Sequence, residues 1–176
     1  MTRTRVNRIA SIAAFGLIAV CVAPIVAAQQ TAAPTPKMKA AAIKVTMVES
    51  SEVKLPADFQ VALYEDLIAQ LKKKGGLHVY REGDRNAEGA ADLIVLHTSA
   101  RGFKVGSERL RQVTTVTGAT SITVHCAFTG KDGKTLLEQD LKGNVRFFGE
   151  NLKATYDFAK KAAQLTHDRF SPTAGT

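Results

Sequence analysis

Hydrophobic and polar residues alternate with a period of two over several stretches of the chain, which is the pattern of half-buried β-strands. The alternation is longest over residues 135–148, where Leu137, Leu141 and Val145 share one parity and charged or polar residues share the other. So regular an alternation predicts antiparallel pairing, with one face of the sheet buried and the other in water. Shorter alternating strands are predicted at residues 43–50, 77–80 and 121–128.

One further strand is predicted over residues 92–103, and its pattern is different. Residues 93–96, with the sequence LIVL, are apolar without interruption. A run of this kind is typical of a strand that is buried on both faces. We therefore expect this strand at the centre of the sheet.

Two longer segments follow the helical period. In residues 55–76 an apolar side chain recurs at every fourth position from Phe59 to Leu71, and a pair of glycines after three lysines ends the pattern. Residues 149–170 carry a wide apolar face opposite a charged arc. Both helices need an apolar surface to cover. The fold class predicted is α+β, a two-layer sandwich with a mainly antiparallel sheet of about five strands and two helices packed on one face.

The single α+β domain is predicted to span residues 43–168, and the segments outside it differ in composition. Residues 1–28 combine three arginines, an apolar stretch and small residues at the end, which is the pattern of a secretory signal peptide. Residues 29–42 are expected to form a flexible leader, and residues 169–176 a disordered tail. The chain is therefore predicted to be exported, to the periplasm or cell envelope of a bacterium.

Two alternatives to cleavage after Ala28 stay open. The apolar stretch is just long enough to span a bilayer, so it is also compatible with an uncleaved anchor. Cys21 is a candidate for lipidation, although Val20 before it is larger than the small residue that a lipidation site prefers. Contact with a membrane is expected only if the signal is uncleaved or lipidated.

Composition and charge refine this picture. A chain of 176 residues with 45% hydrophobic content suits one domain with a genuine core. The net charge is +8, and removal of the signal leaves 21 basic against 16 acidic residues, a net charge of +5. That charge favours anionic partners without identifying one. After cleavage Cys126 is the sole cysteine, so no internal disulfide is expected.

Residues 103–120 form a basic, threonine-rich interval that is a candidate binding surface for an envelope protein or an anionic envelope component. If neighbouring strands align, five basic residues contribute to it: Lys104, Arg109, Arg111, Lys142 and Arg146. The alternative interpretation is a long hairpin with a solvated sheet face, because Glu138 and Asp140 dilute the positive charge. Nucleic acid is not expected as a partner, since no aromatic residues interleave the charges.

No pattern in the sequence indicates an enzyme, and we expect no catalytic, cofactor-binding or metal-binding residues. Residues 84–95 match the beginning of a calcium loop, but the twelfth position, which requires glutamate, is Val95. His97 and His125 are predicted to approach each other across the sheet, whereas Cys126 points to the opposite face and supplies no third zinc ligand. The serines lack the context of a nucleophile elbow.

Several motifs resemble one known family when they are taken in order. They are LPADF at residues 55–59, ADLIVL at 91–96, DGKTLL at 132–137 and GNVRFFGEN at 143–151. Their order is similar to that in the exported bacterial proteins grouped as domain of unknown function 4410, some of which are lipoproteins. The resemblance spans about residues 43–165 and transfers no active site, because none is established for the family.

By analogy with small α+β modules of envelope proteins, this resemblance implies a non-enzymatic binding or assembly role in the envelope. A periplasmic domain that binds a small ligand or a metal is the alternative function.

Overall fold

The computed structural model describes most of the chain from residue 36 onward. The described residues are 36–107, 109, 118–145 and 150–173. The predicted signal peptide, Arg111 and Arg146 lie outside these ranges. Within the described part of the chain, no helix is both long and apolar enough to span a bilayer.

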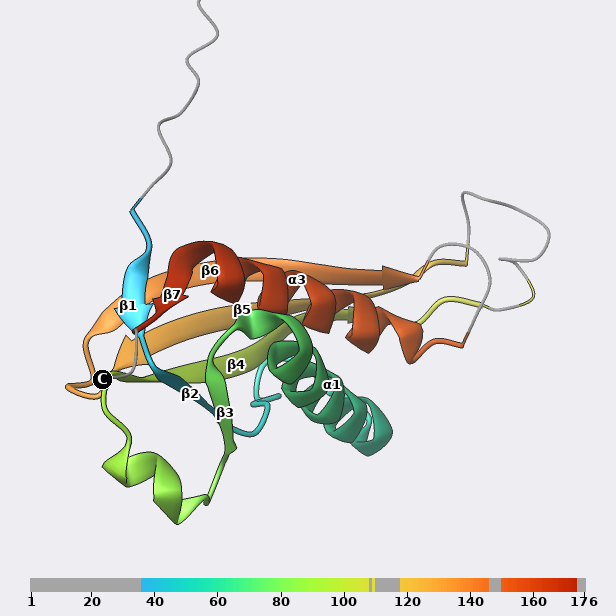
Figure 1. Cartoon of the computed structure of the whole chain (residues 1–176). Helices are drawn as coiled ribbons and strands as arrows, with labels where there is room; N and C mark the ends of the chain where they lie inside the picture. Colours follow the sequence, from blue (N-terminus) through green and yellow to red (C-terminus); the bar gives the residue numbers. More distant parts are fainter. Residues whose placement is uncertain (1–35, 108, 110–117, 146–149, 174–176) are drawn as a thin grey trace, which may run out of the picture. The chain divides into compact units, whose positions relative to one another are not determined.

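Five strands form one sheet in the order β3-β2-β4-β5-β6 (Figure 1). Their bounds are β2 (Ala42–Val45), β3 (His78–Arg81), β4 (Leu93–Lys104), β5 (Thr120–Gly130) and β6 (Thr135–Val145). The strand with the continuous apolar run, β4, lies in the middle of the five. Its predicted central position is therefore confirmed.

The sheet is mixed. The short strand β2 pairs in parallel with both β3 and β4, whereas the longer ladders that join β4, β5 and β6 are antiparallel. The parallel pairing of β2 and β3 follows from the helix that connects them, because a crossover of this length returns the chain in the same direction. Most of the paired residues in the sheet are therefore in antiparallel ladders.

Two long helices pack on one face of this sheet (Figure 1). The first, α1 (Ala57–Gln70), continues as one wider helical turn, η1 (Leu71–Gly75), and ends at Gly76, whose φ of 74° a side chain would disfavour. The second, α3 (Lys153–Arg169), contacts α1 as well as the sheet. The predicted α+β class, with two helices over one sheet, is confirmed.

The core lies between the helices and the sheet. Every second residue of β5 from Ile122 to Phe128 is fully buried there, as the alternation of that strand predicts. Phe158 and its alanine neighbours on α3 are equally inaccessible. Tyr156 of the same helix is 45% exposed, although it is aromatic.

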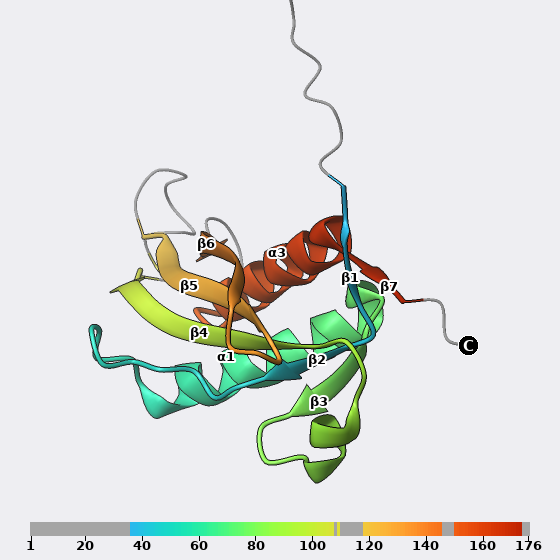
Figure 2. The ribbon, with the colours of Figure 1, turned by 90° about the vertical axis from the view of Figure 1, so that its left-hand side faces the viewer.

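Both ends of the predicted domain need a correction. Residues 38–40 of the expected leader form a strand, β1 (Met38–Ala40), which pairs in parallel with β7 (Phe170–Pro172) of the expected tail (Figure 2). Phe170 is 1% exposed and lies 5.3 Å from Phe128, measured between ring centroids. Strands of three residues are too short to show a hydrophobic period, so composition alone assigned them to the leader and tail.

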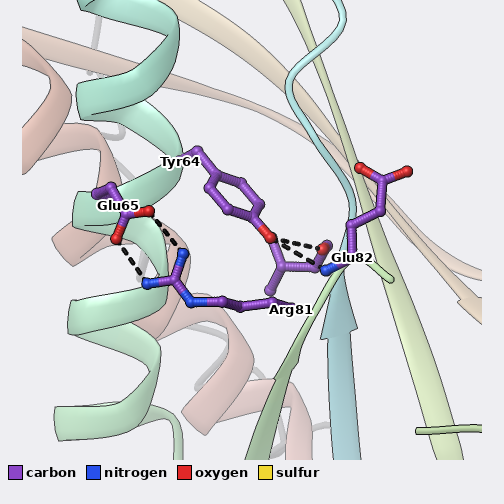
Figure 3. Close-up of polar contacts among 5 residues, drawn as sticks. Tyr64, Glu65, Arg81 and Glu82 are labelled. Carbon is purple, nitrogen blue, oxygen red and sulfur yellow. Dashed lines mark hydrogen bonds and ion pairs between the residues drawn. The ribbon is translucent and has the colours of Figure 1, made fainter. Parts of the chain in front are cut away.

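A polar cluster ties α1 to the parallel edge of the sheet (Figure 3). The two terminal nitrogens of the Arg81 guanidinium, Nη1 and Nη2, each donate to a carboxylate oxygen of Glu65 at 2.6 Å. The hydroxyl of Tyr64, which is buried, accepts a hydrogen bond from the amide of Glu82 at 3.0 Å and lies 3.5 Å from the carbonyl oxygen of Val45. The hydrogen bond from Arg81 lowers the pKa of Glu65.

At the other edge of the sheet, α3 crosses β6 at close range. The amide of Asn144 donates to Asp157 at 3.0 Å, and Lys161 donates to the carbonyl of Lys142 at 2.7 Å. Gly143 lies between these two contacts, and a Cβ atom at that position would collide with the carbonyl oxygen of Ala154 and with Phe158. The approach of helix to strand therefore requires glycine at this point.

Candidate functional site

The face of β4, β5 and β6 that is turned away from α1 and α3 is called the open face here. Every second residue of β5 from Thr120 to Phe128 is buried toward the helices, as are most of the matching residues of β4 and those of β6 from Leu141 to Val145. Most of the residues between them are exposed or half-buried. The three strands together supply hydroxyl, imidazole, carboxylate and ammonium groups to the open face. Because the core does not need these side chains, they are available for contacts outside the domain.

Three polar residues lie in one row across the middle of the open face. Ser99 on β4 is opposite His125 on β5, which is opposite Asp140 on β6. Nδ1 of His125 lies 2.7 Å from Oδ1 of Asp140, so the carboxylate orients the imidazole ring. The sequence analysis missed this row, because it arises from the strand register and not from a local motif.

The row resembles a serine nucleophile with its base only in composition. Among the described residues, Ser99 makes no hydrogen bond to His125. The amide of Ala100, the donor nearest to Ser99 along the chain, is already bonded to the carbonyl of Glu49 at 2.7 Å. An acyl-transfer site needs both the hydrogen bond between nucleophile and base and free oxyanion donors. The arrangement therefore supports polar contacts better than it supports hydrolysis.

A bulge in β4 places a further charged pair beside this row. The ladder with β5 shifts register between Ala100 and Gly102, and the bulged residue Arg101 forms an ion pair with Glu52. The hydrogen bond from Arg101 lowers the pKa of Glu52, so this carboxyl stays ionised at neutral pH. The middle of the open face therefore carries this ion pair beside the carboxylate of Asp140.

Three of the five residues of the predicted basic surface lie within the described ranges. Lys104 is opposite Ser121 and Lys142 is opposite Thr123, so the register brings both lysines to the same end of the open face, with β5 between them. Both lysines and Arg109 are exposed, and no ion pair involves them within the described part of the chain. Arg111 and Arg146, the other two members of the predicted surface, lie outside the described residues.

The two histidines share the open face but do not form a common site. His97 is opposite Ala127, and its Nε2 lies 3.3 Å from Oγ1 of Thr129, whereas His125 is paired with Asp140. In the described ranges, no three histidine, cysteine, aspartate or glutamate side chains gather as metal ligands do.

The turn that resembles a calcium loop has structural roles. Oδ1 of Asp84 accepts from the amide of Asn86 and thereby caps the short helix η2 (Arg85–Gly89). Asp92 adopts a positive φ of 45°, and its carboxylate accepts from Thr173 at 3.0 Å.

Cys126 lies on the buried face of β5, opposite to His125, as the sequence predicts. Burial raises the pKa of its thiol to about 12, and the charge of Asp140 adds to this shift. Only the thiolate is nucleophilic. In the folded domain this thiol is therefore protonated at neutral pH and shielded from solvent.

We expect iodoacetamide to modify Cys126 in the folded protein at about pH 8 only as fast as the domain opens, because burial removes both the thiolate and the access. The measurement uses mass spectrometry on a Cys21→Ser variant, so that one thiol is present. The same variant in urea is the control and should react within minutes. Rapid modification of the folded protein would contradict the burial of this side chain.

No known family model matches this chain, and no curated protein sequence matches it. Solved structures with a similar fold exist at low identity. Two structures of the PelC dodecamer from Paraburkholderia phytofirmans align with TM-scores of 0.56 and 0.55 at 12% identity. The alignments cover 78% and 77% of this chain and 96% and 93% of the PelC chains. At this identity the similarity shows the fold alone, and that fold is the small α+β sandwich described above.

Proposed function

We propose that this protein is an exported accessory module of the bacterial envelope, related to domain of unknown function 4410. It binds another envelope protein or an anionic envelope component and catalyses no reaction. The signal-like residues 1–28 support the localisation. The described domain supports the binding role, because polar side chains of β4, β5 and β6 lie on its open face, where the core does not use them.

One observation carries this proposal. The sheet buries one face under two helices and leaves the other face with charged side chains that the core does not use. At one end of that face Lys104 and Lys142 project without a carboxylate partner in the described residues, and the exposed Arg109 follows β4. Exposed cations of this kind contribute little to folding and are free to meet an anionic surface.

The test reverses these three charges. We expect the triple variant Lys104→Glu, Arg109→Glu, Lys142→Glu to reduce recovery of crosslinked envelope partners by about tenfold, because each reversal replaces an attraction by a repulsion. The measurement is quantitative mass spectrometry after crosslinking in intact cells. A matched variant, Lys73→Glu, Lys74→Glu, Lys160→Glu, changes the net charge equally on exposed helix positions and should keep its partners.

Equal partner recovery from the two triple variants would refute a role for this surface. PelC is described as a dodecamer in both solved structures. For this chain, the protein partner can therefore also be a second copy of itself. Light scattering on the same proteins distinguishes the two kinds of partner. A multimer that the open-face variant dissociates indicates a second copy of the chain as the partner.

A further inference from the structure

The far end of the open face is hollowed. The hollow lies where β2 and β4 meet the hairpin between β5 and β6, close to η2, and its volume is about 390 Å³. Small-molecule sites in proteins occupy roughly 300–1,000 Å³. The hollow is lined by none of the residues that we assign to partner binding. Its size therefore suits one small ligand.

The floor of the hollow is apolar and held in place. Leu93 and Val95 of β4 form it. Leu93 is 6% exposed and packs in a small separate cluster with Ala42 and Ala87. Because η2 supplies Ala87 to that cluster, the floor is fixed by the same segment that borders the hollow. An apolar body of a few carbon atoms can rest on such a floor without rearrangement of the backbone.

The rim carries more positive than negative charge. Lys44 of β2 and Lys131 of the hairpin both line the hollow, together with one carboxylate, that of Glu88. Lys131 donates from Nζ to the backbone carbonyl of Glu88 at 3.0 Å, so its ammonium is held at the rim and keeps further donors. Lys44 is half-buried, and no ion pair or hydrogen bond involves its ammonium in the described part of the chain.

The Lys44 ammonium has no anionic partner among the described residues, so together with Lys131 it offers positive charge to a negative group. Two hydrogen-bonding groups lie beside the lysines. Oγ1 of Thr129 and Nε2 of His97 are 3.3 Å apart on the wall of the hollow. These groups can orient an oxygen-rich head while the lysines supply charge.

We propose that this hollow binds a small amphipathic anion, namely a carboxylate or phosphate head on a short apolar body. The ammonium groups of Lys44 and Lys131 bind the head. Thr129 and His97 orient it, and the apolar body rests on Leu93 and Val95. The site is separate from the basic end of the open face, so either function can fail without the other.

Titration calorimetry on the full chain tests the site with three probes that share an eight-carbon body: octanoate, octyl phosphate and octan-1-ol. We expect saturable binding at one site for at least one of the two anions and none for the neutral alcohol. The stronger of the two anions identifies the head group. The double variant Lys44→Gln, Lys131→Gln should weaken that binding by about tenfold or more, because it removes both charges at the head.

The control is the double variant Lys73→Gln, Lys160→Gln, which removes two exposed helix lysines outside the hollow and should bind as the unmodified protein does. Circular dichroism melts of each variant check that the fold is kept. Equal binding of octanol and octanoate, absence of saturation for both anions, or equal weakening by the Lys73→Gln, Lys160→Gln variant would each overturn the site. None of these outcomes alters the crosslinking result, so failure here is distinguishable from failure of the proposed function.

Discussion

Replacement of Phe158 by alanine is expected to lower the free energy of unfolding by about 3–5 kcal/mol. The ring is fully buried at the contact between α3 and the sheet, and it is one of the largest side chains of the core. Its removal leaves a cavity that cannot fill, because its neighbours on α3 are alanines. Urea unfolding followed by circular dichroism measures the change, which should appear in the midpoint without a change in slope.

Tyr156→Ala is the matched control for this prediction. It removes a larger aromatic side chain from the same helix, two residues away, at a position that is 45% exposed. We expect it to cost less than about 1 kcal/mol. Similar losses in the two variants would mean that α3 does not press Phe158 against the sheet.

The second large effect is expected from the addition of a single methyl group at Gly143. Alanine there would place its Cβ against the carbonyl oxygen of Ala154 and against Phe158. The backbone of a helix cannot yield as a flexible side chain does, so α3 has to move away from β6. We expect a loss of about 1–3 kcal/mol from such overpacking. The shift of α3 should also weaken the hydrogen bond between Asn144 and Asp157, which amide hydrogen exchange at Asn144 reports.

Gly89→Ala separates the steric effect from the general effect of a glycine replacement. Gly89 has open space around its Cα and no positive φ. We expect its replacement to change the stability by no more than about 0.5 kcal/mol. If Gly143→Ala were as mild as this control, the close crossing of α3 over β6 would be wrong.

The alternation of hydrophobic and polar residues along the strands predicted much of this fold. The buried positions of β5 and the polar positions of β6 follow directly from the alternation, and the apolar run of β4 places that strand in the centre. Alternation does not determine strand direction. The helix between β2 and β3 is what imposes parallel pairing, so connection length was the more informative signal at this edge.

Less of the candidate site could be predicted from the sequence. Ser99, His125 and Asp140 are far apart along the chain, and they align only because of a particular register across three strands. A bulge at Arg101 shifts that register by one residue, and no local pattern marks it. The hollow likewise depends on how the hairpin of Gly130–Gly133 lies against η2. By contrast, Lys104 and Lys142 were grouped from the sequence on the condition that neighbouring strands align. The structure places them on β4 and β6, at the same end of the open face with β5 between them.

The pairing of β1 with β7 links the two termini mechanically. A molecule held at the envelope by its N-terminal segment would transmit any pull through residues 38–40 to the strand that begins at Phe170. Parallel strands loaded from opposite termini resist in shear, where all their hydrogen bonds share the force. Phe170, whose buried ring packs against Phe128, would hold β7 in place under this force. Proteolytic trimming of the last seven residues would therefore loosen the tether at the opposite terminus.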